Sequence, residues 1–237
     1  MTADVDIIIN TGDRAQAFGL CQGYLHRQVT QATYRVIVTD DGTAVSHPYI
    51  PCTYLRREPG PNDPPHTQTL NLQLAMQHVT AANVIIWEDD DWYGTGYLEE
   101  QMQRLQNADL VGDITAYYYG VGRWKGWRIF DEQDGHDWAS LMRTAIGPNA
   151  MDIWRRSIEG DHSHDRRLWT TAREAGLTLD SRPVRLGHQR AIGIKGMPGR
   201  AGCTHADWNY APDPGYTILK DWVREDWETY AAVLETH

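Results

Sequence analysis

Three short apolar runs in the first ninety residues each pass directly into a polar turn. The runs are residues 5–10, 33–38 and 83–87, and β-branched side chains dominate them. Runs of this length and composition are typical of buried strands in a parallel sheet. Segments with helical spacing of apolar residues lie between and after them. This alternation predicts an α/β fold with a mainly parallel central sheet flanked by helices.

The polar turns that follow these runs are rich in acids. They read TGDR at 11–14, DDG at 40–42 and EDDD at 88–91. Because the carboxyl ends of parallel strands meet at one edge of a sheet, where ligands bind, we expect the three turns to converge.

The run EDDD at 88–91 carries the highest density of negative charge among these turns. Four adjacent carboxylates at the end of a buried strand are costly unless positive charge sits beside them. A solvated turn is the plain alternative, but the expected convergence favours Mg²⁺ or Mn²⁺, which prefer carboxylate oxygens. A metal needs fewer than four acids, so Asp91 is also a candidate N-cap for the helix that follows.

Length, net charge and cysteine content restrict which classes of protein this chain can belong to. A chain of 237 residues can bury one sizeable core, and we expect a single domain over 1–237. The net charge of −10 gives no general attraction to nucleic acid or an anionic membrane. The three cysteines lack metal or redox spacing, and the first apolar run is too short to span a bilayer. We therefore expect a cytoplasmic protein with reduced thiols and no membrane partner.

The second half of the chain is less regular. Residues 113–130 predict one or two strands around a glycine-rich turn, and residues 149–158 and 165–176 predict helices. A final helix is expected over 221–234, which places a small β element and a C-terminal helix beside the central sheet.

The stretch 181–206 is basic and rich in glycine, and it contains no acid. Its cations are Arg182, Arg185, Arg190, Lys195 and Arg200. Such a loop suits a flexible lid that closes on a diphosphate, since glycine lets the backbone approach and the cations neutralise phosphate charge. A plain surface loop is the alternative.

Two sequence segments resemble the nucleotide-diphospho-sugar glycosyltransferases of the GT-A fold, especially the inverting family 2 type and its small phage and bacterial members. They are VIVTDDGT at 36–43 and VIIWEDDDWYGTGYLE at 84–99. The resemblance implies a Rossmann-like GT-A fold with a nucleotide-sugar half at 1–110 and an acceptor half at 111–237. It matches Glu88 and Asp90 to the family's DxD pair, with Asp90 contacting Mn²⁺ or Mg²⁺.

The same resemblance implies roles for other residues. It places Thr11, Asp13 and Arg14 near the base or diphosphate, and Asp40 or Asp41 on the uracil or ribose. Glu88 and Asp89 would also face the donor, and Lys195 and Arg200 the leaving phosphates. A histidine often completes the metal shell in this family; His188 is preferred here over His205, because it follows an expected strand at 182–186.

The segment EGDHSHDRRLW at 159–169 is similar to the family's E-D-x-x-L-W helix start. The match makes Asp165 the catalytic base, with His164 where the family has Glu. A carboxylate within hydrogen-bond reach of an acceptor hydroxyl can take its proton as it attacks. Two alternatives stay open: Asp165 or Asp161 as a helix N-cap, and His162 with His164 as half of a zinc site.

These features together predict a metal-dependent, inverting glycosyltransferase that uses a UDP-sugar. The first choice of acceptor is a hydroxymethylated pyrimidine in DNA, which the basic stretch would permit. The alternatives are a soluble glycan or small-molecule acceptor, a sugar-phosphate nucleotidylyltransferase, and a non-catalytic carbohydrate- or nucleotide-binding module.

Overall fold

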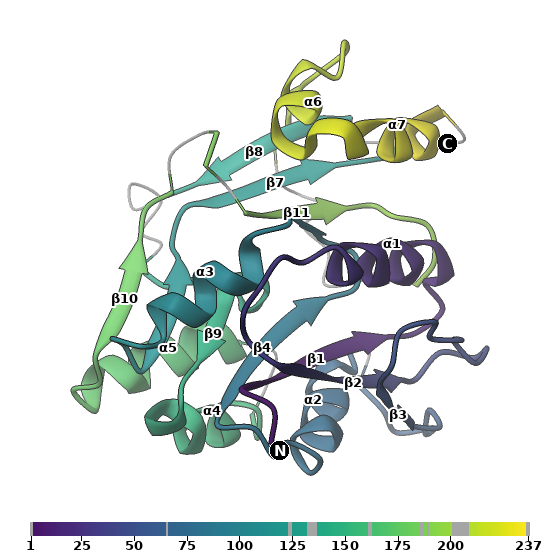
Figure 1. Ribbon diagram of the computed structural model, residues 1–237. Helices are drawn as coiled ribbons and strands as arrows, with labels where there is room; N and C mark the ends of the chain where they lie inside the picture. The colour runs from purple at the N-terminus through teal and green to yellow at the C-terminus, as the bar shows by residue number, and fades with distance from the viewer. Residues whose placement is uncertain are drawn as a thin grey trace.

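The computed structural model describes residues 2–64, 66–122, 125–131, 137–160, 163–184, 187–188, 190–200 and 209–235. These residues form two sheets with helices packed against them (Figure 1). The larger sheet has the strand order β10-β6-β9-β4-β1-β2-β3. Its strands are β1 (Val5–Thr11), β2 (Tyr34–Asp40), β3 (Thr53–Arg56), β4 (Asn83–Glu88), β6 (Leu110–Asp113), β9 (Thr144–Ile146) and β10 (Leu179–Arg182).

The strands that carry the three apolar runs are neighbours. β1 pairs in parallel with both β2 and β4, and β2 pairs in parallel with β3. β9 breaks the pattern, because it runs antiparallel between β4 and β6. The predicted α/β fold with a mainly parallel sheet is therefore confirmed.

Helices cover both faces of this sheet because apolar side chains of β1 alternate between two cores. Ile7 and Ile9 pack with α1 (Ala15–His26) and α3 (Tyr97–Arg104), whereas Ile8 packs on the opposite face. The helices on that opposite face are α2 (Gln68–Met76), α4 (Met151–Ser157) and α5 (His164–Glu174). Within the described part of the chain, no helix has the length and apolar content needed to cross a bilayer.

The smaller sheet lies on the α1 side of the larger one (Figure 1). Its order is β12-β8-β7-β11-β5, and its strands are β5 (Trp92–Tyr93), β7 (Ala116–Gly120), β8 (Gly126–Phe130), β11 (Ala191–Lys195) and β12 (Ala211–Pro212). β7 and β8 pair antiparallel with each other within 113–130, where one or two strands were expected.

β11 corrects the prediction that the whole of 181–206 is a flexible lid. Ala191, Ile192 and Ile194 are buried, and β11 pairs with both β7 and β5. Glycine is required at 193 because a Cβ there would lie 2.2 Å from Cδ1 of Tyr118. The glycine thus serves close packing of a strand rather than mobility, and the strand expected at 182–186 ends at Arg182.

The C-terminal helix is also interrupted. α6 (Thr217–Val223) and α7 (Trp227–Glu235) are separated by a short 3₁₀ turn that begins at Arg224. Arg224 has a φ of 54°, a left-handed conformation that no helix continues through. Val223 and Tyr230 are nevertheless both buried in the same core, as their helical spacing predicts.

A buried ion pair fastens α3 to the edge of the larger sheet. Arg104 contacts Asp113 of β6 at 2.7 Å and Asp180 of β10 at 3.1 Å, and the side chains of Arg104 and Asp113 are each only 5% exposed. Arg104 also donates to the carbonyl oxygens of Gly112 and Asp180. One guanidinium therefore joins a helix and two strands.

Replacing Arg104 with alanine is expected to lower the free energy of unfolding by about 3–5 kcal/mol, because Asp113 would keep a buried charge without its cation. Urea denaturation measures the change. Arg155→Ala is the control, since its pair with Asp152 is exposed and should contribute less than about 1 kcal/mol. Equal losses in the two variants would contradict the prediction.

Candidate functional site

The register of the larger sheet brings the three polar turns together. Asn10 lies beside both Thr39 and Glu88, and Thr11 lies beside Asp40. Because these strands are parallel, all three turns follow the carboxyl ends of the strands, on the same side of the sheet. The expected convergence of 11–14, 40–42 and 88–91 is confirmed.

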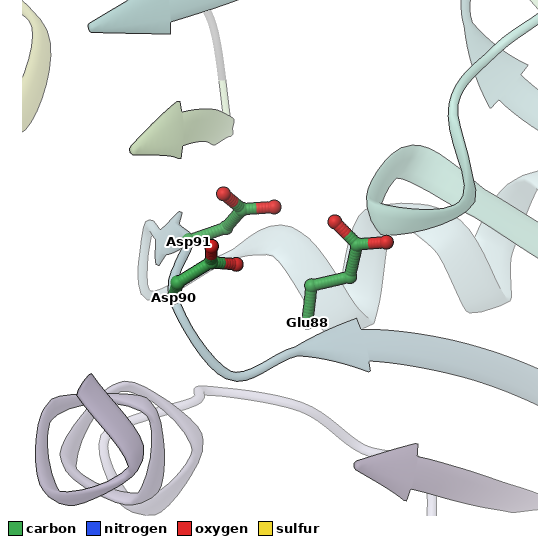
Figure 2. A group of neighbouring side chains, drawn as sticks. All are labelled: Glu88, Asp90 and Asp91. Carbon is green, nitrogen blue, oxygen red and sulfur yellow. The ribbon is translucent and has the colours of Figure 1, made fainter. Parts of the chain in front are cut away.

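The acids at 88–91 form a tight turn between two strands. Glu88 ends β4, and β5 begins at Trp92. Asp89 and Asp91 are buried, whereas the Asp90 side chain is 17% exposed. Glu88, Asp90 and Asp91 each offer a carboxylate oxygen, and these three atoms lie within 4.8 Å of one another (Figure 2). We call these three side chains the carboxylate group.

Two cations lie against the acid turn. Arg14, which precedes α1, contacts Asp89 at 2.7 Å and Asp90 at 3.4 Å. Lys195, at the end of β11, contacts Asp91 at 3.1 Å and Asp90 at 3.9 Å. The positive charge that four adjacent acids require is therefore built into the chain.

Burial and charge act in opposite directions on these groups. Burial disfavours the charged form of Lys195, but Asp90 and Asp91 outweigh it and raise the pKa of Lys195. Burial raises the pKa of Asp89 to about 6 against the opposing effect of Arg14. Burial likewise raises the pKa of Asp91, although Lys195 opposes it. Burial of the acid turn and its two cations thus act against each other on Asp89 and Asp91.

The carboxylate group fits a divalent cation. Its donors are hard oxygens, which Mg²⁺ and Mn²⁺ prefer. Oδ2 of Asp91 is buried and accepts no hydrogen bond from the described residues, so this oxygen is left for a ligand.

Asp91 does not cap a helix. α3 begins at Tyr97 after Gly96, and no side chain caps it. Oδ1 of Asp91 instead accepts the backbone N–H of Ile194 at 2.9 Å and the ammonium of Lys195. The short strand β5 separates Asp91 from α3, which the sequence did not reveal.

Asp40 and Asp41 are fully buried, and their carboxylates accept hydrogen bonds from other residues of the chain. Asp40 accepts the N–H groups of Gly42 at 2.9 Å and Ser46 at 2.7 Å. Asp41 accepts from Arg57 at 2.5 Å and also from Arg200. Burial opposes its ionisation, but these hydrogen bonds prevail and lower the pKa of Asp41. The two acids therefore fix the turn after β2.

The turn after β1 is fixed in a similar way. The carboxylate of Asp13 accepts the N–H groups of Thr43 at 2.8 Å and Ala44 at 3.2 Å. The Asp13 carbonyl accepts the N–H of Arg200 at 3.2 Å, and Arg14 Nε donates to the Arg200 carbonyl at 2.8 Å. Arg200 thus joins both turns, and Thr11 is buried at the end of β1.

Asp165 lies in the first turn of α5 and is partly buried. The helix begins after Ser163 without a side-chain cap, so Asp165 is not its N-cap. Burial raises the pKa of Asp165 to about 6, and the charge of Glu88 adds to the effect. The structure therefore brings Asp165 within electrostatic reach of the carboxylate group.

The histidines fall in different places. His164 is buried, with Nε2 3.1 Å from Oγ1 of Thr69. His188 is exposed and does not belong to the carboxylate group. His205, together with Asp161 and His162, lies outside the described residues.

Several side chains at the site gave no sequence signal. Arg57 pairs with Asp41, and Gln68 Nε2 donates to Oε1 of Glu88 at 3.1 Å. Tyr118 is buried with the Lys195 ammonium 5.6 Å from its ring centre. Tyr118 is the middle residue of three consecutive tyrosines in β7. Each of these contacts depends on strand pairing between distant segments.

Comparison with solved structures identifies the architecture. S. aureus TarS 1–349 superposes with a TM-score of 0.56 at 12% identity, over 81% of this chain and 60% of that one. Its complex with UDP gives 0.54 at 11% identity, again over 81% and 60%. TarS is a GT-A-type glycosyltransferase. The chain has the GT-A fold.

The match has limits in length and sequence. A longer TarS structure gives a TM-score of 0.53 at 10% identity, and this chain spans 36% of its length. No protein-family model and no curated protein matches the sequence. Identity this low relates the folds alone.

Proposed function

We propose that this protein is a metal-dependent glycosyltransferase that transfers a sugar from a nucleotide diphosphate sugar, with a UDP-sugar as the first choice, to an acceptor hydroxyl. The observation that carries the proposal is the carboxylate group, bordered by Lys195 and Arg14, at the carboxyl edge of a GT-A sheet. A binding module has no need of such a group together with Asp165, a carboxyl whose pKa is raised by burial and by the charge of Glu88. The UDP complex of TarS, which shares the fold, supports the choice of donor.

In this proposal residues 1–110 hold the donor and residues 111–237 hold the acceptor. Glu88, Asp90 and Asp91 would hold Mn²⁺ or Mg²⁺, which supplies charge neutralisation to the departing nucleoside diphosphate. Arg14, Lys195 and Arg200 place further positive charge at the same edge for the phosphates. His188 remains a proposed ligand that would have to move toward the group.

The nucleobase and ribose of the donor would lie on the two turns after β1 and β2. Because the carboxylates of Asp13, Asp40 and Asp41 fix these turns, their contribution to binding would be to shape the backbone of 11–14 and 40–42. Thr11 opens the turn after β1 and lies beside Asp40 of the other turn, and Asp89 holds Arg14 in place for the phosphates.

Asp165 would act as the catalytic base. Its carboxylate takes the proton of the acceptor hydroxyl as that oxygen attacks the sugar carbon from the face opposite the leaving group, which gives inversion. The pKa of about 6 suits this task, since the group is ionised at neutral pH and still basic.

The pH profile of kcat/KM is expected to fall on the acidic side with a midpoint near the Asp165 pKa of about 6. Below that pH the carboxyl is protonated and cannot accept a proton, so the rate should drop about tenfold per pH unit. Initial rates between pH 5 and 8 at constant metal and donor give the profile. A rate that stays level down to pH 5 would contradict a base of raised pKa.

The donor class is tested with the unmodified protein. A panel of UDP-, GDP-, TDP- and CMP-sugars is incubated with Mn²⁺, with Mg²⁺ and with EDTA, and the released nucleotide is quantified. Metal-dependent release of UDP from one UDP-sugar is expected. If no nucleotide sugar is bound or turned over under any condition, the glycosyltransferase proposal fails and the acids return to a structural role.

The proposed acceptor is a hydroxymethylated pyrimidine in DNA, with a soluble glycan or small molecule as the alternative. The basic residues of 181–206 support the DNA acceptor, whereas the net charge of −10 favours the alternative. Once a donor is known, transfer of its radiolabelled sugar to hydroxymethylated DNA, unmodified DNA and a set of soluble glycans separates these acceptors.

A further inference from the structure

Lys195 lies against two of the carboxylates that a metal ion would use. Its ammonium lies 3.1 Å from Oδ1 of Asp91 and 3.9 Å from Oδ2 of Asp90, which are both members of the carboxylate group. The side chain is only 13% exposed. An ammonium in this position balances much of the negative charge of the turn.

A divalent ion and the Lys195 ammonium repel each other strongly at such distances, because little water screens charges in a buried site. An ion that binds Asp90 and Asp91 would therefore have to move the ammonium away. The diphosphate of the donor is an anion that would take up the displaced ammonium. The backbone of β11 need not move, since the N–H of Ile194 holds Asp91 independently of Lys195.

We infer that Lys195 is an internal counter-ion that exchanges with the metal: it neutralises the carboxylate group in the free protein and transfers to the diphosphate when the metal binds. The inference rests on the proposed function. Arg14 does not exchange in this way, because its Nη1 is held by Asp89 and its Nε by the Arg200 carbonyl. Two consequences follow for binding: the metal alone binds weakly, and metal and nucleotide strengthen each other.

Manganese binding, read from the electron paramagnetic resonance signal of free Mn²⁺, tests the exchange without relying on activity. Titrations with and without UDP are made on the wild type, Lys195→Met and Lys195→Arg. Lys220→Met is the control, since this exposed lysine lies on α6 over the ring of Trp227. Thermal melting shows whether each variant is folded.

Without UDP, Lys195→Met is expected to bind Mn²⁺ about tenfold more tightly than the wild type, within the usual range of coupling between two sites. UDP should tighten Mn²⁺ binding in the wild type, and the gain should be smaller in Lys195→Met. Lys195→Arg keeps the charge and should behave as the wild type, as should Lys220→Met.

Three results would overturn the inference. One is equal or weaker Mn²⁺ binding by folded Lys195→Met in the absence of UDP. Another is tight binding by Lys195→Arg, which would show that charge is not the cause. The third, available even if Lys195→Met does not fold, is a wild type whose Mn²⁺ affinity is unchanged by UDP. Absence of Mn²⁺ binding in every protein with and without UDP would instead overturn the proposed metal site itself.

Discussion

Replacing Asp90 with alanine is expected to reduce metal-dependent release of UDP about 10³-fold, because the reaction loses the charge stabilisation that a held metal provides. Asp90 is the member of the carboxylate group that lies near both cations, Arg14 and Lys195. Steady-state assays of nucleotide release with saturating Mn²⁺ measure the loss. The Mn²⁺ affinity should fall in parallel.

Asp152→Ala is the matched control, because this acid is exposed on α4 and contacts only the exposed Arg155 in the described structure. It should leave the rate unchanged. An Asp90→Ala protein with the Mn²⁺ affinity and turnover of the wild type would remove Asp90 from the metal site and leave Glu88 and Asp91 as its candidates.

Replacing Asp165 with asparagine is expected to slow sugar transfer by about 10²–10⁴-fold, the usual contribution of a positioned base. Asparagine keeps the shape of the side chain but cannot accept the proton. Donor binding should be unchanged, because Asp165 is on α5 and not among the turns that would hold the nucleotide. Isothermal titration with UDP and single-turnover transfer separate the two effects.

A second signature distinguishes a base from a structural residue. The acidic fall of the pH profile should become shallower in Asp165→Asn, in which Asp89 is left with a pKa of about 6, whereas it should be unchanged in Asp152→Asn. If Asp165→Asn transfers sugar at the rate of the wild type, another group must take the proton, and His164 is excluded as a simple substitute because it is buried against Thr69.

Local sequence patterns were sufficient for the parts of the fold that depend on neighbouring residues. The β-branched runs of β1, β2 and β4 identified buried strands, and the acids after them identified the edge where a site would form. Gly176, at the end of the helix predicted over 165–176, has a φ of 72° two residues after the end of α5. These features are encoded within about ten residues each.

Pairings between distant segments escaped prediction. β9 is only three residues long, and its antiparallel place between β4 and β6 has no local signal. The alternation of glycine with cations suggested a mobile lid, yet apolar residues within the same stretch form β11. The partners of Asp41, Arg57 and Arg200, are separated from it by 16 and 159 positions. Sequence patterns identified the acids and several of the cations, and the fold showed which cation pairs with which acid.

The acid turn connects the two sheets of the molecule. Glu88 is the last residue of a strand in the larger sheet, and Trp92 opens a strand in the smaller one, so only three aspartates bridge them. This three-residue segment is fixed at both ends by strand pairing, so its ends cannot move apart freely. Any rotation of one sheet against the other therefore changes the distance between Glu88 and its partner acids. The carboxylate group is therefore held jointly by both sheets, and its spacing depends on how they are placed relative to each other.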